Sequence, residues 1–535
     1  MNTNRCRLMK GCGLLVMGLM GMSSALMAAP RQTKPNIIFI LADDMGYGDV
    51  GCYNENCKIP TPHLDRLGKE GMRFTDAHTN SSVCTPTRYG ILTGRYAWRT
   101  RKKNGVLQGH SSPLIERDRG TVASLLKAQG YATACIGKWH LGMDWTSRDG
   151  KTVSESNGQN VDFSAPIRNG PLERGFDYFF GISASLNMPP HAFIENRNVV
   201  GELTYLDDAE ELKEHNISGK TGWVAAGYRQ DQVLPTLTRK AVAWIRKHTR
   251  DHSEEPFFLF LPLNAPHAPI VPSKDYLDRS GIGRYGDFCM EVDGSVGEIL
   301  KTLDELNLAG STMVIFTADN GCSPQAHFGD LQSQGHYPSY IYRGLKGSLW
   351  EGGHRMPFLV RWPDVVKEGT QCHQTICVTD FLATLADMLK VAIPDHVGQD
   401  SVSFFPALQG KPLPGSSERG IVHHSDAGHF SIRRGKWKLV LHEKGGTRRH
   451  NPKDGPVSNP AALQLFDMEK DPSETTNVQH LHREKVEQLS MLLANYIAKG
   501  RSTPGVPQEN DPGKHWTQIE VLKKFLVNRT AVPSK

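Results

Sequence analysis

Four apolar stretches, separated by segments with helical periodicity, constrain the fold of this chain more than any other feature. They cover residues 35–44, 132–140, 256–267 and 312–321. Uninterrupted apolar runs of this length are typical of strands that are buried on both faces of a parallel sheet. Amphipathic segments such as PHLDRLGKEG and LTRKAVAWIRKH lie between them. This alternation predicts an α/β fold with a doubly wound, mostly parallel sheet flanked by helices.

Each of the four stretches ends in side chains that can carry chemistry. These are acids, an amide, a lysine and two histidines: Asp43, Asp44, Lys138, His140, His267, Asp319 and Asn320. In open α/β sheets, ligands bind in the crevice outside the carboxyl ends of the strands. Any one of these residues alone would be interpreted as a helix cap or a surface charge. Their shared position at strand ends predicts a functional site along that edge of the sheet.

The character of the sequence changes near residue 410. A connector rich in Pro, Gly and Ser follows, and the segment FSIRRGKWKLVLH predicts a hairpin that turns at Arg434 and Gly435. Residues 483–500 predict an amphipathic helix that ends at Gly500. We therefore expect a catalytic domain, a smaller α+β subdomain with antiparallel strands and a polar tail, over residues 30–410, 411–510 and 511–535 respectively.

The first 29 residues have the pattern of a secretory signal peptide. Arg5, Arg7 and Lys10 precede the short apolar run GLLVMGLMGM, and small residues lead from it to Pro30. The run is too short to remain as a membrane span, and no later segment reaches about 18 apolar residues. We expect export to the periplasm or beyond, without a stable membrane anchor; a membrane-anchored N-terminus is the alternative.

Composition narrows the possible partners. A net charge of +6 over 535 residues is small, and no basic stripe with interleaved aromatic residues argues for nucleic acid. Eight cysteines remain after the signal peptide, too few for disulfides to organise a chain of this length. Cys52 with Cys57, and Cys372 with Cys377, are close enough in sequence to form small loops, but their pairing stays open.

Cys84 begins the segment CTPTRYGILTGR, which has the pattern of a helix start. Thr85 can cap the helix, Pro86 suits its first position and Gly94 can end it. Cys84 would then lie at a helix N-terminus, where free amides and the dipole favour an anion, with Arg88 one turn further on. From this local pattern, Cys84 could be a buried free thiol, half of a disulfide or a redox thiol of low pKa.

A series of ordered blocks surrounds this segment. CTPTR with LTGR has the C-x-P-x-R pattern, and GKWHLG follows from Gly137. LADDMGYGD, NAPHAP, TADNG and RGLKG with EGGHR accompany them. Together these blocks resemble the type I sulfatases, which are formylglycine-dependent, arylsulfatase-like enzymes of the alkaline phosphatase superfamily. The resemblance covers about residues 35–410 and extends weakly into IRRGKWKL and LFDMEKDPSE.

The resemblance implies that Cys84 is there to be chemically converted. In this family a separate maturase, a transient partner, oxidises the cysteine during export to formylglycine, whose aldehyde hydrates to a diol. One diol oxygen attacks the sulfur of a sulfate ester, and the other restores the aldehyde as sulfate leaves. Pro86 and Arg88 then serve partly as recognition signals for the maturase.

The resemblance also implies one bound cation. Hard oxygen ligands favour Ca²⁺, with Mg²⁺ the lesser alternative. Its expected ligands are Asp43, Asp44, Asp319, Asn320 and the modified Cys84.

Five further residues match catalytic positions of the family. Arg88, Lys138 and Lys346 match cations that hold the diol and the sulfate. His140 matches the base that takes the proton of the second hydroxyl. His267 matches the acid near the leaving oxygen, a role that Lys346 can share.

The substrate expected from the resemblance is a sulfated carbohydrate. Ser185 matches a sulfate-contacting serine, and His336 is predicted on the rim of the pocket; Lys138, His267 and Lys346 complete the expected substrate contacts. Residues 181–200 are polar, with scattered apolar residues only, which favours a sugar over an aryl or steroid leaving group. We expect an exo-acting enzyme that acts on a galactose or N-acetylgalactosamine unit of a sulfated glycan.

Two other classes of function stand beside this one. The first is a phosphomonoesterase or phosphodiesterase on the same scaffold, but such enzymes commonly use two metals and a Ser or Thr nucleophile. The second is a non-catalytic, glycan-binding pseudo-sulfatase, which would require a lost catalytic residue. All matched positions keep the residues of the family pattern.

Overall fold

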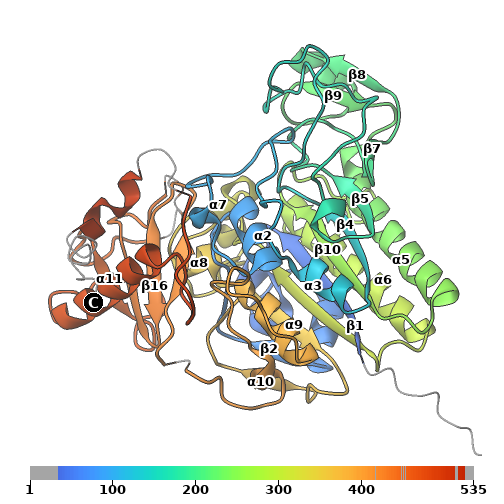
Figure 1. The fold of residues 1–535 in the computed structure, drawn as a ribbon. Helices are drawn as coiled ribbons and strands as arrows, with labels where there is room; N and C mark the ends of the chain where they lie inside the picture. Colours follow the sequence, from blue (N-terminus) through green and yellow to red (C-terminus); the bar gives the residue numbers. More distant parts are fainter. Residues whose placement is uncertain are drawn as a thin grey trace, which may run out of the picture. The chain divides into compact units, whose positions relative to one another are not determined.

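A ten-stranded mixed sheet forms the centre of the computed structural model (Figure 1). Its strand order is β13-β2-β12-β11-β1-β10-β4-β5-β6-β7. The central strands are parallel: β11 (Thr312–Ala318), β1 (Asn36–Asp43), β10 (Phe257–Pro266), β4 (Ala132–Lys138) and β5 (Tyr178–Ile182). The outer strands are β13 (Thr370–Cys372), β2 (Met72–Phe74), β12 (Phe358–Arg361), β6 (Ile194–Glu195) and β7 (Asn198–Val199). The predicted mostly parallel sheet is confirmed, and the four apolar stretches form β1, β4, β10 and β11.

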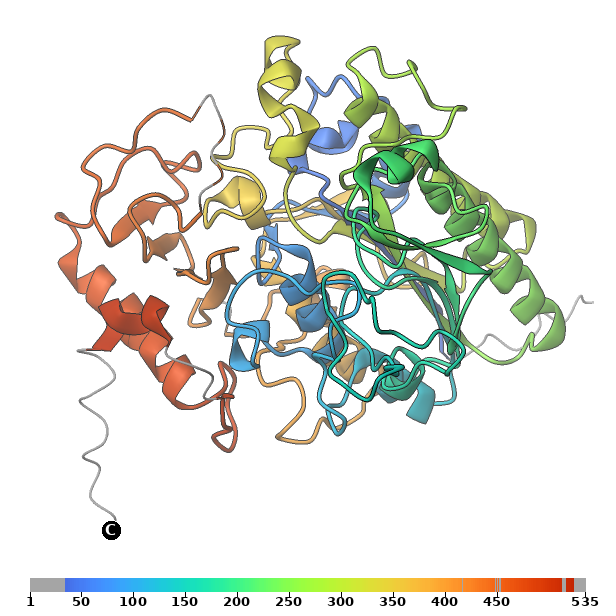
Figure 2. The same cartoon turned by 90° about the horizontal axis from the view of Figure 1, so that it is seen from above.

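Helices cover both faces of this sheet because each central strand is apolar on both sides. In β1, Ile38 and Ile40 join one buried cluster, whereas Ile37, Phe39 and Leu41 join another. The first cluster includes side chains of α1 (Pro62–Lys69), α5 (Val233–Asp251) and α6 (Arg284–Glu305). The second includes side chains of α2 (Cys84–Thr93), α3 (Val122–Ala128), α9 (Phe381–Leu389) and α10 (Phe405–Leu408). Figures 1 and 2 show α5 and α6 side by side on one face.

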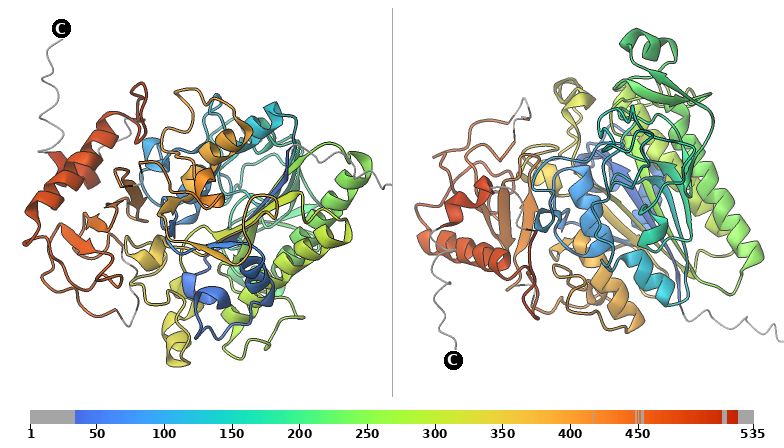
Figure 3. Two further views of the ribbon diagram at one scale, coloured as in Figure 1. Left: turned by 90° about the horizontal axis from the view of Figure 1, so that it is seen from below. Right: turned by 45° about the horizontal axis from the view of Figure 1, so that its top comes forward.

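A separate four-stranded antiparallel sheet follows in the C-terminal part. It consists of β15 (Ile421–His424), β16 (Phe430–Arg434), β17 (Trp437–Val440) and β18 (Gln464–Asp467) in that order. The predicted hairpin is confirmed, but its turn is one residue later than predicted: Arg434 pairs with Trp437, and Gly435 and Lys436 form the turn. Helix α11 (Arg483–Ala498) packs against β16 and β17, as the red helix and orange strands of Figure 3 show. The domain limits themselves stay predictions.

Smaller elements complete the fold. They are the parallel pair β3 (Ala77–His78) with β14 (Ile376–Cys377), the antiparallel pair β8 (Leu203–Leu206) with β9 (Gly222–Ala225), and the helices α4 (Ala209–Glu214), α7 (Phe328–Ser333) and α8 (Glu351–His354).

The structure describes residues 34–415, 417–447, 449, 451, 454–511 and 516–523. The expected signal peptide therefore lies outside the described residues, as does most of the expected tail. Within these described segments, no helix combines the length and apolar character needed to cross a membrane. The eight cysteines from Cys52 onward are all free thiols, including both pairs that are close in sequence.

Candidate active site

The carboxyl ends of the central strands meet at one edge of the sheet. β1 pairs with β11 up to Ala42 opposite Ala318, so Asp43 and Asp319 follow at the same level. On its other side Asp43 lies opposite Pro266, directly before His267. The predicted residues at these ends are buried, each at most 9% exposed: Asp43, Asp44, Lys138, His140, His267, Asp319 and Asn320.

Cys84 is the first residue of α2 and faces this edge. Its Sγ lies 3.5 Å from Oδ1 of Asp43, and the residue is 1% exposed. Burial raises the pKa of the Cys84 thiol to about 12, which argues against a redox thiol of low pKa. Because Cys84 is also a free thiol, it is not half of a disulfide. A buried, protonated thiol remains.

The start of α2 differs from the prediction, whereas its end does not. Thr85 does not cap the helix: its hydroxyl donates to the carbonyl of His140 (3.0 Å) and accepts from the N–H of Leu107 (3.1 Å). The position before the helix is Val83, whose side chain cannot cap. Gly94 ends the helix in the left-handed conformation, as predicted. Thr85 thus joins the nucleophile turn to the His140 loop.

Three cations surround the cysteine and the acids. Lys138 Nζ lies 2.6 Å from Oδ2 of Asp43, and Lys346 Nζ lies 2.7 Å from Oδ2 of Asp44. Arg88 donates from Nε and Nη2 to Oδ2 of Asp319, at 3.0 and 2.7 Å. All three cationic side chains are 6% exposed or less, so little solvent screens these charges.

The pKa values of the acids follow from this arrangement. Burial opposes ionisation of Asp43, but Lys138 and other cations hold its pKa well below the usual range. The pKa of Asp44 is lowered for the same reason, against burial, by His267 and Lys346. Burial, followed by the Asp43 charge, raises the pKa of Asp319 to about 7. The site thus concentrates negative charge that a cation would stabilise.

The oxygen atoms here suit a hard cation. Asn320 donates from Nδ2 to Oδ1 of Asp44 (2.7 Å), while its Oδ1 is buried with no hydrogen-bond partner among the described residues. Ligand atoms of Asp43, Asp44, Cys84 and His267 lie within 4.8 Å of one another. An unpartnered amide oxygen beside three carboxylates is a donor set that fits Ca²⁺ or Mg²⁺.

The two histidines are placed differently. His140 donates from Nε2 to the carbonyl of Leu107 (2.9 Å), which leaves Nδ1 with a free lone pair and no hydrogen-bond partner among the described residues. Burial, with Lys138 and Arg88, holds its pKa well below the usual value. His267 places Nε2 3.7 Å from Oδ2 of Asp44, and burial lowers its pKa to about 4. Both rings are therefore uncharged near neutral pH.

The two predicted substrate contacts outside these strand ends have different outcomes. His336 is fully buried: its Nε2 donates to Oδ1 of Asp49 (2.7 Å) and its Nδ1 accepts from the N–H of Lys58 (3.3 Å). The prediction that it lies on the rim is wrong, because both ring nitrogens support the loop that carries Asp44. Ser185 lies in the loop after β5 with its buried hydroxyl unpartnered among described residues, and its sulfate contact stays a prediction.

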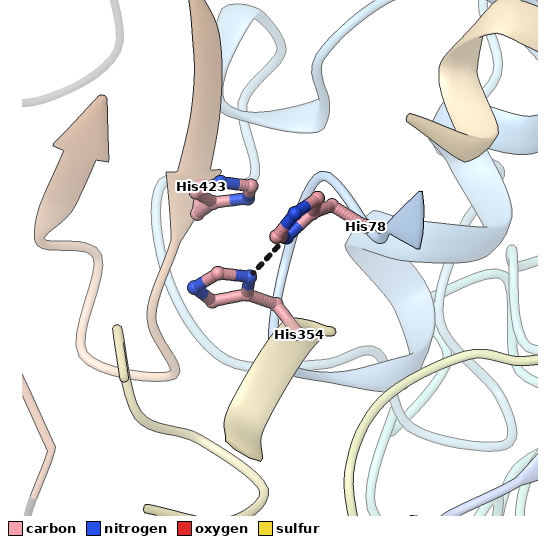
Figure 4. A group of neighbouring side chains, drawn as sticks. All are labelled: His78, His354 and His423. Carbon is pink, nitrogen blue, oxygen red and sulfur yellow. Dashed lines mark hydrogen bonds between the residues drawn. The ribbon is translucent and has the colours of Figure 1, made fainter. Parts of the chain in front are cut away.

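Sequence analysis missed a cluster of three buried histidines behind the nucleophile loop. Figure 4 shows His78, His354 and His423, from β3, α8 and β15; their nitrogens lie within 4.8 Å of one another. His354 and His423 stack with ring centroids 3.7 Å apart, and His78 Nδ1 lies 3.1 Å from His354 Nδ1. Burial lowers the pKa of all three. The rings of these histidines join the C-terminal sheet to the segment that leads to Cys84, with His78 tilted against the stacked pair. In the sequence, only the adjacent histidines at 423 and 424 and the EGGHR block pointed to this cluster.

Comparisons with known proteins agree with this geometry. A profile of the family described as Sulfatase matches residues 35–391, and one described as N-sulphoglucosamine sulphohydrolase, C-terminal, matches residues 345–502. An N-acetylgalactosamine-6-O-sulfatase from Bacteroides thetaiotaomicron is 35% identical over 506 residues, covering 86% of this chain and 93% of the relative. Human steryl-sulfatase is 32% identical over 450 residues, covering 74% and 73%.

A solved structure is similar as well. It comes from work on the metabolism of multiple glycosaminoglycans by Bacteroides thetaiotaomicron, with a TM-score of 0.74 at 34% identity. The match covers 86% of this chain and 99% of that chain.

Proposed function

This chain belongs to the sulfatase family and is a sulfuric ester hydrolase, and we propose that it removes sulfate from a saccharide, namely a galactose or N-acetylgalactosamine unit of a sulfated glycan. The relative named N-acetylgalactosamine-6-O-sulfatase, which matches over most of both chains, supports this substrate class. Human steryl-sulfatase matches a smaller share of this chain at lower identity, and it makes a steroid sulfate the alternative to test.

The observation that carries the mechanism is the position of Cys84, whose buried Sγ lies 3.5 Å from Oδ1 of Asp43, where burial raises the pKa of the thiol to about 12. Such a thiol is a poor nucleophile near neutral pH, although it lies at the centre of the site. We therefore infer that Cys84 is converted to formylglycine by a maturase. When formed, the hydrated aldehyde supplies one hydroxyl for attack on sulfur and a second whose deprotonation releases sulfate.

The acids and the amide are proposed to hold one Ca²⁺. Asp43, Asp44, Asp319 and the unpartnered Oδ1 of Asn320 would be its ligands, with the modified residue 84. When bound, the ion neutralises sulfate charge and acidifies the attacking hydroxyl.

The cations around the ligands orient the reacting groups. Lys138 and Arg88 are fixed on Asp43 and Asp319, so their charges are already in place when the sulfate ester binds. Preorganised cations of this kind stabilise the charge that develops on sulfate oxygens. The proposed sulfate contact of Ser185 would add a hydrogen bond from a hydroxyl that has no partner among the described residues.

Proton transfer is proposed at two imidazole nitrogens. Nδ1 of His140 has a free lone pair, and the Thr85 hydroxyl binds the backbone carbonyl of His140; we propose that this nitrogen takes the proton of the second hydroxyl. Nε2 of His267 is proposed to protonate the leaving oxygen, with Lys346 sharing the role. A bound sulfate anion favours the protonated His267 ring, since an opposite charge nearby raises a histidine pKa.

We also propose that the protein is exported to the periplasm or beyond. The charged and apolar pattern of residues 1–29 supports this proposal. Maturation during export would give the maturase access to Cys84 before burial. Mass spectrometry of the mature N-terminus tests it: a chain that keeps residues 1–29 in the cell would contradict export.

A panel of mono-sulfated monosaccharides, differing in sugar and in sulfated carbon, tests the substrate class. Sulfate release and the desulfated product are measured beside nitrophenyl and steroid sulfates. We expect the highest kcat/KM on a galactose or N-acetylgalactosamine sulfate. If all sugars are inert while a steroid sulfate turns over efficiently, the carbohydrate proposal fails although the chain remains a sulfatase.

A further inference from the structure

A cavity of about 490 Å³ lies beside the loop that carries His267. Ala268 lines this cavity directly after His267, and Nδ1 of His267 donates to the carbonyl of Ala268 (2.5 Å). Tyr285 forms another part of the wall, and its hydroxyl lies 3.2 Å from the carbonyl oxygen of Asp44. The cavity therefore borders the active site, although no residue placed in that site lines it.

The opposite wall of the cavity belongs to α7 and to the residues around it. Gln325, Asp330 and Gln334 line the cavity on this side. A methyl group at Gly335 would lie 3.8 Å from Cε of Lys58, so the Lys58 side chain runs beside the residue that follows Gln334. Lys58 thus lies next to the cavity, where the chain leaves α7.

Two exposed cations on this surface are unpaired among the described residues. Arg284, at the start of α6, lines the cavity, and neither its guanidinium nor the Lys58 ammonium forms an ion pair or a hydrogen bond with a described residue. The one acid in the wall, Asp330, is 80% exposed at its side chain and lies 3.9 Å from the His327 ring. Free cations beside a cavity attract anions, and an arginine can bind a carboxylate or a tetrahedral oxyanion through two parallel hydrogen bonds.

Exposed aromatic and aliphatic side chains follow on the same segment. Tyr337, Tyr340 and Ile341 are 42%, 36% and 48% exposed. Their backbone is fixed, since the N–H of Gly48 donates to the carbonyl of Pro338 (2.7 Å). Tyr340 has a φ of 57°, a left-handed conformation that is uncommon for a large side chain and is often kept at functional sites. Exposed tyrosines on a fixed backbone offer flat apolar faces to sugar rings and hydroxyls for hydrogen bonds.

We propose that this surface, formed by the cavity, Lys58, Arg284 and residues 337–341, binds the chain of an anionic polysaccharide beyond the unit whose sulfate is removed. The inference rests on the saccharide substrate proposed above. The tyrosines would pack against sugar rings, while the two cations would pair with sulfate or carboxylate groups on neighbouring units. A second copy of this chain is a poorer occupant, because a symmetric contact would bring the unpaired cations of both copies to one interface. The surface would favour longer substrates without taking part in the chemistry at Cys84.

Binding is measured apart from turnover, by calorimetry on Cys84→Ser protein with a chondroitin 6-sulfate tetrasaccharide, whose units alternate between carboxylated and sulfated sugars. Arg284→Glu and Lys58→Glu should each weaken binding about threefold to tenfold, and the losses should shrink at high salt. Asp330→Asn removes the acid of the wall and should strengthen binding about twofold. Lys470→Glu, which changes an exposed lysine of the C-terminal subdomain, is the matched control and should have an effect below about twofold.

Kinetics of the matured enzyme give a second readout. On the tetrasaccharide, kcat/KM of both charge-reversal variants should fall by the factor seen in binding, whereas on a mono-sulfated monosaccharide it should stay within about twofold of wild type. Tyr340→Asn, which suits a left-handed backbone, should also lower kcat/KM on the tetrasaccharide only.

Three results would overturn the inference. They are unchanged affinity in both Arg284→Glu and Lys58→Glu, an equal loss in Lys470→Glu, which would show general charge attraction, and an equal loss on the monosaccharide, which would show a structural effect. If the wild-type enzyme turns over a steroid sulfate but no sugar, the saccharide proposal itself fails. If it turns over the monosaccharide but does not bind the tetrasaccharide more tightly, only this inference fails.

Discussion

Protein in which Cys84 stays a thiol is expected to be folded and nearly inactive. The buried thiol has a pKa of about 12, so at pH 8 roughly one molecule in ten thousand carries the thiolate. If the thiolate were the nucleophile, its low population alone would limit kcat/KM by that factor. The same burial should slow alkylation of Cys84 by iodoacetamide relative to Cys52 or Cys57, which are partly exposed.

The assay compares the chain expressed with and without a maturase. Mass spectrometry of the Cys84 peptide gives the fraction converted to the aldehyde, and sulfate release gives kcat per chain. Activity should be proportional to that fraction, with an intercept near zero. Cys84→Ser, made without a serine-competent maturase, should keep its fold and substrate binding but lose turnover. Full activity in protein whose Cys84 is quantitatively a thiol would refute the reasoning.

Three further predictions concern metal, packing and pH. Exhaustive chelation should abolish activity, and Ca²⁺ should restore it better than Zn²⁺. Asp319→Ala should lose both activity and the bound ion, as measured by elemental analysis. Full turnover by protein that retains no bound cation would contradict the metal site. Gly90→Ala would place a methyl group 2.3 Å from Oδ1 of Asn80 behind α2. Chemical denaturation should show that the free energy of unfolding falls by about 1–3 kcal/mol. An unchanged denaturation midpoint would show that Asn80 moves aside without cost. Burial raises the pKa of Asp293 from 3.8 to about 7, so the folded state favours the protonated carboxyl. The contribution of this group to stability is therefore fully present below pH 3.8 and is lost as the pH rises to 7. Asp293→Asn keeps an acceptor for the N–H groups of His63 and Leu64. Its free energy of unfolding should exceed that of wild type by up to about 4 kcal/mol at pH 8 and be similar at pH 4. Equal pH profiles of unfolding for the two proteins would contradict this.

The functional residues at the strand ends could be predicted because the sequence pattern that marks each of them lies within a few neighbouring residues. Each central strand is an apolar run that stops at a polar residue, so Asp43, Lys138 and Asp319 could be assigned to one edge before any contact was known. Parallel pairing then places these ends together, since all carboxyl ends of parallel strands lie at the same edge.

What could not be predicted depends on partners distant in sequence. Thr85 is a residue type that often caps a helix, but its hydroxyl is hydrogen-bonded to the backbone of Leu107 and His140, which only the fold brings near. His336 looked like a polar loop residue, yet Asp49, 287 residues earlier, holds it in the interior. A side chain's residue type limits its possible bonds, whereas the tertiary fold chooses among them.

The C-terminal subdomain illustrates the same point at the nucleophile itself. The carbonyl of His424, at the end of β15, accepts hydrogen bonds from the N–H of Ser82 (3.0 Å) and from the hydroxyls of Ser81 (2.8 Å) and Ser82 (3.3 Å). These donors lie two and three residues before Cys84, so one strand end fixes the segment that leads to the reactive residue. Asp426 follows two residues later, and its N–H donates to the carbonyl of Gly347, so the same segment also contacts the turn that carries Lys346.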